Sequence, residues 1–295
     1  MPAQLRVVRR RIRSVQSTMK ITRAMELISA SRVARAQQRV EQARPYTEEI
    51  TAALESVVST EVLLSHPLLE QRHEADAAAV LVVTSDRGLA GPYNANVVRT
   101  AEELQAHLRE DGIEPKLYVT GRKGVTYYRF RQREIEQSWT GFSHAPAYDD
   151  ARAVVDALVD AFLHHQVDQI HAVYTAFVSA ATQRAVARRF VPLVIEETEE
   201  RPPEPIPQYL FEPSPERLLD ALLPRYLQAR VFTAMLEAAA SEHAARRRAM
   251  KAATDNAEEL IENLTREYNQ ARQAQITQEI MEIVGGAEAL QSTGS

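Results

Sequence analysis

Two glycine-bearing segments contain the residues best suited to bind a ligand, because their backbone N–H groups could hold a phosphate or another anion. Asp86–Gly91 follows the strand-like run Ala78–Ser85, and Gly121–Gly124 follows the run Lys116–Thr120. Ligands often bind at such positions in α/β folds. Neither segment has the GxxxxGKS/T or GxGxxG spacing of a nucleotide-binding loop. Structural turns are therefore the favoured interpretation of both segments.

The remaining reactive side chains form no catalytic pattern either. His164 and His165 are adjacent, so on a helix they point in different directions, and Asp149–Asp150 is typical of a helix start. No HExxH zinc motif and no GxSxG nucleophile motif occurs. The chain has no cysteine, which excludes disulfides, thiolate metal sites and cysteine nucleophiles. We predict a protein with no catalytic residues, no cofactor and no metal.

Apolar runs in this sequence are short. The longest, Ala77–Val83, is far below the ~18 residues that span a bilayer. The N-terminus is charged and lacks the apolar region of a secretory signal. We expect a soluble protein of a reducing interior that meets a membrane only through partners.

The elements at the two ends of the chain are predicted to be long helices, because glycine and proline are scarce there. Ala3–Arg44 contains neither residue, and Arg225–Val284 contains neither over 60 consecutive positions. At 1.5 Å per residue, these segments give helices of ~60 Å before Pro45 and roughly 90 Å at the other end. Gly285–Gly286 is expected to end the second helix in a left-handed cap.

Apolar residues in both terminal segments recur at the spacing of three and four that buries one face of a helix. The N-terminal seam is Leu5, Val8, Ile12, Val15 and Met19, followed after a slip in register by Ile21, Met25 and Ile28 and then by Val33, Ala36 and Val40. The C-terminal stripes are Leu260, Leu264, Tyr268 and Ala271, then Ile276, Ile280 and Ile283. A rod of two paired helices is favoured over two separate helices of an ordinary bundle.

The middle of the chain alternates between strand and helix patterns. The strands are predicted at Ala78–Ser85, Lys116–Thr120, Ile170–Val178 and Phe190–Ile195, and the helices include Val97–Leu108 and a segment capped by Asp149. This order predicts a Rossmann-like α/β unit with a mostly parallel sheet. The fold class is therefore mixed: a long antiparallel coiled coil of the N- and C-terminal helices plus an inserted α/β domain. We divide the chain into residues 1–66, 67–215 with a Pro-rich loop at 196–215, and 216–295.

Charge is concentrated at the N-terminus. Residues 1–44 hold eleven Lys or Arg and two Glu, a net charge of +9, which leaves −14 for the other 251 residues of a chain at −5. A basic helix of this kind favours an acidic partner surface, nucleic acid or anionic lipid. A solvated helix face is the alternative.

Several segments resemble the gamma subunit of bacterial F-type ATP synthases. At the N-terminus they are Ile12–Gln16, Lys20–Glu26 and Ala30–Arg32, and at the C-terminus Ala240–Arg246, Met250–Ala257 and Tyr268–Ile280. Ser85–Leu89 and Tyr209–Pro213 resemble the family in the middle of the chain. The departures are Arg32, where lysine is common, Ala90, and the divergent loop 196–208. No cysteine-bearing regulatory insert is present.

The resemblance implies a rotor of the central stalk, which passes torque from the membrane c ring to the catalytic beta subunits. It implies as partners the alpha and beta subunits of the catalytic hexamer, the epsilon subunit and the c-subunit ring, with one copy per complex. The chain would be a non-catalytic subunit at the cytoplasmic face of the bacterial cell membrane, attached through these partners, with no nucleic acid. Two alternatives stay open: a basic coiled-coil protein that binds nucleic acid or acts as a scaffold, and a small-molecule enzyme using the Gly88 or Gly121 turn.

The resemblance also implies contact residues. Those expected near the acidic segment of the beta subunit are Met25, Arg32, Arg35, Glu242 and Arg246. Those expected to touch beta-subunit loops higher on the shaft are Arg272, Gln273, Thr277 and Glu279, and those at the foot that meets the c ring and epsilon are Tyr209, Phe211 and Glu212. Glu242 and Arg246 are also spaced i,i+4, so a small structural role is the competing interpretation for that pair.

Overall fold

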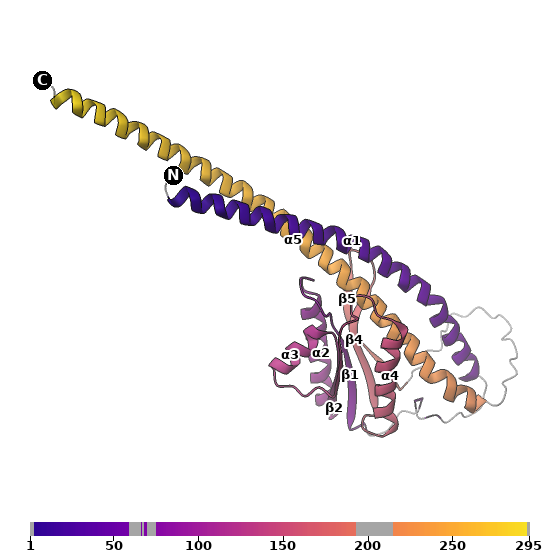
Figure 1. The fold of residues 1–295 in the computed structure, drawn as a ribbon. Helices are drawn as coiled ribbons and strands as arrows, with labels where there is room; N and C mark the ends of the chain where they lie inside the picture. The colour runs from indigo at the N-terminus through magenta and orange to yellow at the C-terminus, as the bar shows by residue number, and fades with distance from the viewer. Residues whose placement is uncertain (1–2, 59–65, 67, 70–74, 193–214, 294–295) are drawn as a thin grey trace. The chain divides into compact units, whose positions relative to one another are not determined.

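The computed structural model describes residues 3–58, 66, 68–69, 75–192 and 215–293 (Figure 1). The chain forms two compact units: unit 1 is Met1–Ile28 with Arg247–Ser295, and unit 2 is Ser29–Arg246. Two long helices, α1 (Ala3–Val58) and α5 (Pro215–Thr293), contribute to both units. The predicted pair of long terminal helices is thereby confirmed.

Both long helices continue through a proline. Pro45 lies inside α1 and Pro224 inside α5. Pro45 supplies no N–H to the carbonyl of Glu41, four residues earlier, and in the next positions the hydroxyl of Thr47 donates to the carbonyl of Ala43 at 3.2 Å. The expected cap at Gly285–Gly286 is wrong, because α5 runs through it to Thr293. The following residues Ala-Glu-Ala-Leu favour helix strongly enough to offset the glycine cost of about 1 kcal/mol each.

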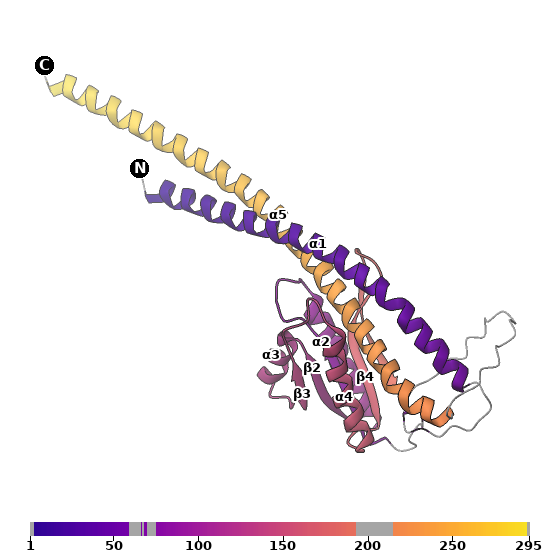
Figure 2. The same ribbon diagram turned by 45° about the vertical axis from the view of Figure 1, so that its right-hand side comes forward.

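In unit 1 the two helices lie side by side, with the N- and C-termini at the same end (Figures 1 and 2). The predicted seam from Leu5 to Met19 is confirmed, since all five of its residues are buried or half-buried and their neighbours are exposed. The next seam position is Thr22, whose Oγ1 lies 2.8 Å from Oγ1 of Thr254. Ile21 and Ile28 were expected in the seam but are 58% and 53% exposed. The spacing of three after Met19 reaches Thr22, which turns Ile21 outward.

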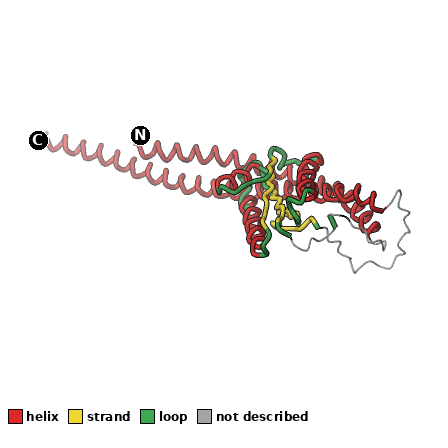
Figure 3. Tube along the Cα trace, turned by 90° about the horizontal axis from the view of Figure 1, so that it is seen from below, coloured by secondary structure: helices red, strands yellow, loops and turns green. Residues whose placement is uncertain are grey.

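The α5 side of the seam was predicted in part. Leu264 is buried and Tyr268 and Ala271 are half-buried, as expected. Leu260 is 41% exposed, however, because the helical spacing places Ala257 and Ile261 against α1 instead. The second expected stripe is also exposed: Ile276 by 44%, Ile280 by 55% and Ile283 by 72%. In this region α5 extends beyond the N-terminus of α1 (Figure 3).

Unit 2 contains a five-stranded sheet in the order β3-β2-β1-β4-β5. The strands are β1 (Ala77–Val83), β2 (Glu114–Thr120), β3 (Gln137–Trp139), β4 (Gln169–Phe177) and β5 (Gln183–Val191). The first four are parallel and β5 is antiparallel to β4, so the prediction of a mostly parallel sheet is confirmed. The last strand was predicted too late, at Phe190–Ile195, because β5 is an edge strand rich in exposed polar residues. The short β3 was not predicted.

Helices cover both faces of the sheet. The helices α2 (Tyr93–Glu110) and α3 (Arg122–Phe130) bury one face, and α4 (Tyr148–Leu163) lies on the other (Figure 1). Within unit 2, α1 and α5 join the α4 side of the core. The expected cap at Asp149 is wrong, because the N-cap of α4 is Ala147, two residues earlier, and the carboxylate of Asp150 in the first turn accepts the N–H of Ala147 at 2.8 Å. The Pro-rich loop 196–215 lies outside the described residues except for its last position.

Candidate functional site: the junction of α5 with the sheet edge

Four polar side chains on one short stretch of α5 are buried in unit 2. The relative exposures are 0% for Ser241, 1% for Glu242, 2% for His243 and 6% for Arg246. Burying polar groups is costly unless they find hydrogen-bond partners. The surrounding buried residues are alanines, which let other backbone segments approach α5 closely. The partners of these four side chains therefore define how α5 docks.

Arg246 binds the loop that follows β1. Its guanidinium donates to the carbonyl of Gly88 at 3.2 and 3.3 Å and to that of Arg87 at 3.2 Å. It also donates to Oε1 of Glu242 at 2.7 Å, so the predicted i,i+4 pair forms, but buried. The loop thus presents carbonyl oxygens to a cation. An anion site at Gly88 would need N–H groups there, so these contacts favour the structural interpretation of the turn.

The second glycine segment uses its backbone N–H groups internally. Gly121 donates to the carbonyl of Trp139, and Lys123 to that of Ser85. Gly124 donates to Oγ1 of Thr84 at 2.9 Å. A side chain at Gly124 would meet that oxygen at 2.7 Å, so glycine is needed for the close approach of α3 to β1. This segment is a structural turn followed by the first turn of α3.

Glu242 lies in a tightly enclosed environment. Its Oε2 is buried without a hydrogen-bond partner among the described residues. Tyr93, itself buried, is close enough that burial and the negative charge of Glu242 together raise the pKa of the tyrosine hydroxyl above its ordinary value. In the described part of unit 2, the ion pair that compensates the charge of Glu242 is the one with Arg246.

Asp86 connects the loops at the carboxyl edge of the sheet. Its carboxylate accepts the N–H groups of Arg122 at 3.1 Å, Gly141 at 2.9 Å and Ser143 at 3.0 Å. Burial acts to raise the pKa of Asp86, but these backbone hydrogen bonds outweigh it and lower the pKa below its usual value. One carboxylate thereby fixes the loops that follow β1, β2 and β3.

The loop held by Asp86 in turn receives His243. The ring of His243 donates from Nε2 to the carbonyl of His144 at 3.0 Å. Ser241 donates to the carbonyl of Thr175 in β4 at 3.2 Å. Together with Arg246, these contacts attach α5 to three separate segments at the sheet edge. Sequence reasoning assigned no role to Asp86, Ser241 or His243. Their places after the first strand and inside an alanine-rich helix segment are the signals that could have found them.

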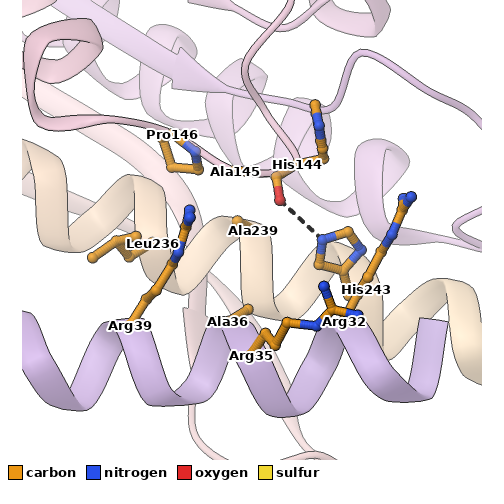
Figure 4. Close-up of a pocket in the computed structure, with 10 residues that line it drawn as sticks. All are labelled: Arg32, Arg35, Ala36, Arg39, His144, Ala145, Pro146, Leu236, Ala239 and His243. Carbon is orange, nitrogen blue, oxygen red and sulfur yellow. Dashed lines mark hydrogen bonds between the residues drawn. The ribbon is translucent and has the colours of Figure 1, made fainter. Parts of the chain in front are cut away.

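A cavity of about 260 Å³ lies beside this junction within unit 2 (Figure 4). Its lining comes from α1, α5 and the loop before α4: Arg32, Arg35, Ala36, Arg39, Leu236, Ala239, His243 and His144–Pro146. Arg32 is half-buried, whereas Arg35 and Arg39 are exposed. The structure therefore brings the predicted residues Arg32 and Arg35 together with His243.

The other predicted contact residues lie elsewhere. Met25 is half-buried in unit 1. Arg272, Gln273, Thr277 and Glu279 are exposed on the part of α5 that belongs to unit 1. Tyr209, Phe211 and Glu212 lie outside the described residues. The contacts expected of all these residues stay predictions.

No three His, Asp or Glu side chains among the described residues gather as metal ligands would. No described helix combines the length and the apolar character needed to cross a membrane.

Comparison with known proteins places the chain among well-defined relatives. A family model described as ATP synthase matches residues 4–290. The ATP synthase gamma chain of Acidothermus cellulolyticus is 59% identical, with all of both chains covered, and that of Parafrankia sp. is 57% identical over 99% of each. In fold, the chain is similar to one in the Euglena gracilis mitochondrial ATP synthase (OSCP/F1/c-ring), with a TM-score of 0.72, 19% identity, and coverage of 99% of this chain and 96% of that one. A second structure, the rotor of the same Euglena enzyme, gives a TM-score of 0.67 at 16% identity, covering 92% of this chain and 99% of that one.

Proposed function

The chain belongs to the ATP synthase gamma family, and we propose that its paired helices α1 and α5 form the shaft of a rotor that drives the catalytic subunits. The chain is the central-stalk subunit of an ATP synthase. Its partners are the alpha and beta subunits of the catalytic hexamer and the c-subunit ring, and in our proposal also the epsilon subunit, with one copy per complex. The nucleic-acid-binding or scaffold alternative has no support from these relatives.

The proposal also specifies the chain's part in catalysis and its location in the cell. The chain contributes no catalytic residue and acts by contact alone. It sits at the cytoplasmic face of the bacterial cell membrane and is attached there through its partners. Residues 67–215 form the base, and residues 1–66 and 216–295 form the shaft.

One observation carries the shaft proposal: the last part of α5 in unit 1 is a helix with exposed apolar residues that no other described helix covers. Ile276, Ile280 and Ile283 are exposed there, and Met281 and Val284 are 70% and 50% exposed. An exposed apolar patch of this kind marks an interaction surface. In the proposal it turns inside the ring of alpha and beta subunits, with Arg272, Gln273, Thr277 and Glu279 on the same segment touching beta-subunit loops.

The lower contact region comprises Met25, Arg32 and Arg35 on α1. The cationic side chains of Arg32 and Arg35 would face the acidic segment of the beta subunit. Glu242 and Arg246 support this region from within, because both are buried and Arg246 holds the loop after β1. Tyr209, Phe211 and Glu212 would meet the c ring and epsilon at the foot.

A shaft can bias the catalytic subunits only through contacts that differ between its orientations. Torque entering at the base must also reach α5 without slippage. In unit 2 the hydrogen bonds of Ser241, His243 and Arg246 to three different segments supply that attachment.

The test is reconstitution of the full chain with its cognate alpha and beta subunits and with membrane vesicles that contain the c ring. We expect a stable complex with strongly altered ATP hydrolysis and coupled proton pumping. Truncation after Leu264 should weaken coupling more than assembly. Truncation after Gly286, which keeps all the exposed apolar residues named above, is the matched control and should leave coupling intact. If the alpha and beta subunits assemble identically without the chain and hydrolyse ATP at the same rate, the proposal is wrong.

A further inference from the structure

The cavity beside the junction is strongly cationic. Arg32, Arg35 and Arg39 are spaced i, i+3 and i+7, so they share one face of α1. None of the three forms an ion pair with a carboxylate in the described part of the chain, and no acidic residue lines the cavity. Arg35 donates to the hydroxyl of Ser31 at 3.0 Å. Guanidinium groups gathered in this way attract anions and bind phosphate and carboxylate oxygens well.

The wall of the cavity contributes a buried hydrogen-bond acceptor. A carbonyl oxygen can only accept, so the bond to the carbonyl of His144 requires the hydrogen on Nε2 of His243. The neutral ring then carries a lone pair on Nδ1. That atom is buried and has no hydrogen-bond partner among the described residues. In the view of Figure 4, Arg32 and Arg39 extend from α1 on either side of His243, with Arg35 beneath the ring.

We infer that this cavity binds a protonated oxyanion, free hydrogen phosphate. Its oxygens would accept hydrogen bonds from Arg32, Arg35 and Arg39, and its hydroxyl would donate to Nδ1 of His243. This inference goes beyond the rotor function and does not depend on it. The volume of about 260 Å³ lies below the roughly 300–1,000 Å³ of pockets for drug-sized ligands, which favours a small ion with a few waters.

The proton on the ligand distinguishes phosphate from other anions. Sulfate and the carboxylates of an acidic protein segment carry no proton at neutral pH, so neither can donate to Nδ1. The charge state of His243 fits this requirement. Burial lowers the pKa of the ring to about 4. The charges that face the ring, on Arg246 of α5, Arg32 of α1 and His144 of the loop, also lower this pKa, whereas the hydrogen bond to the His144 carbonyl raises it.

The experiment is calorimetric titration of the full chain with inorganic phosphate, sulfate and glycerol 3-phosphate at pH 7.5 and constant ionic strength. We expect one phosphate per chain and at least ~10-fold weaker binding of sulfate, because one hydrogen bond to a buried group is lost. Glycerol 3-phosphate carries no P–OH proton at pH 7.5, because the second pKa of a phosphomonoester is about 6, so it should bind as weakly as sulfate. Binding of glycerol 3-phosphate as tight as that of inorganic phosphate would overturn the role of Nδ1.

Substitutions test separately the arginine donors and the Nδ1 acceptor of His243. Arg32→Ala should weaken phosphate binding ~10–100-fold, whereas Arg23→Ala removes the same charge from α1 outside the cavity and should leave binding unchanged. His243→Gln keeps an amide N–H near Nε2 for the His144 carbonyl but removes the acceptor at Nδ1. It should bring phosphate affinity down to that of sulfate.

A further measurement uses the unaltered chain, so its result does not depend on whether the variants fold. With ¹⁵N-labelled histidine, phosphate should shift the Nδ1 resonance of His243, and sulfate should not. The inference is overturned if phosphate does not bind, if it binds without moving that resonance, or if phosphate and sulfate bind equally. It is also overturned if an acidic peptide such as hexaglutamate binds the cavity and phosphate does not.

Discussion

Removing Arg246 should destabilise unit 2 more than any exposed charge change. In Arg246→Met, Glu242 would remain 1% exposed with no compensating charge, and its Oε2 already lacks a hydrogen-bond partner among the described residues. The carbonyls of Arg87 and Gly88 would lose their donor as well. Breaking a buried ion pair on one side costs about 3–5 kcal/mol of the free energy of unfolding, and we expect a loss in that range.

The reciprocal change should be milder. In Glu242→Gln the amide oxygen can still accept from Arg246, whose contacts with the loop carbonyls remain, so we expect a loss of about 1–2 kcal/mol. Removing both charges together, in Glu242→Leu with Arg246→Met, should recover about 2 kcal/mol relative to Arg246→Met alone, because no buried charge is left without a partner.

Trp139 provides the assay. It is the chain's one tryptophan, it lies in β3, and it stacks on Tyr118 with ring centroids 6.5 Å apart. Its fluorescence during urea unfolding therefore reports on unit 2. Arg99→Met, which breaks an exposed i,i+4 pair of 3.9 Å in α2, is the matched control and should cost at most about 0.5 kcal/mol. The reasoning fails if Arg246→Met costs less than 1 kcal/mol, or if the double variant is no more stable than Arg246→Met alone.

Three further outcomes are expected. Gly124→Ala should lower the free energy of unfolding of unit 2 by about 2 kcal/mol in the same urea assay, because the new Cβ would meet neighbouring side-chain atoms at 2.7 and 2.8 Å. Thr22→Val should cost about 1 kcal/mol of helix pairing in unit 1, and adding Thr254→Val should recover part of it, as measured by circular dichroism at 222 nm during heating. Lowering the pH from 7 to 4.5 should destabilise unit 2 by roughly 2–3 kcal/mol for each of His171 and His243. Burial lowers both pKa values from 6.5 to about 4, so between these values the unfolded chain binds more protons than the folded chain and unfolding is favoured as the pH falls. The stability of the His243→Gln variant should therefore depend less on pH.

Hydrophobic periodicity predicted the helix pair well where the interface is apolar. The spacing from Leu5 to Met19 indicated the buried face correctly. The prediction failed at the next turn because it followed the apolar residue Ile21, whereas the interface continues through Thr22. A threonine is accommodated there because Thr254 faces it and the two hydroxyls form a hydrogen bond. A pattern of apolar residues in one helix contains no information about a polar partner on the other.

The junction illustrates a different limit. The i,i+4 spacing of Glu242 and Arg246 is the same for an exposed pair and a buried one, so the sequence indicated that they interact but not that they are enclosed. Asp86 is bonded to backbone groups 36 to 57 positions away. Backbone N–H groups are present at every residue except proline, so no sequence pattern marks which of them will meet a given carboxylate.

The alanines of α5 explain why its few polar residues matter. Ala238–Ala240, Ala244 and Ala245 are all buried, which brings the helix close to its neighbours in unit 2. The methyl groups of alanine are small and nearly spherical, so contacts between them alone would leave the rotation and translation of α5 weakly defined. Hydrogen bonds are directional, and those of Ser241, His243 and Arg246 end on three separate segments. Only one position of α5 satisfies all three sets of hydrogen bonds. A helix that has to transmit torque needs a single defined position more than it needs additional buried area.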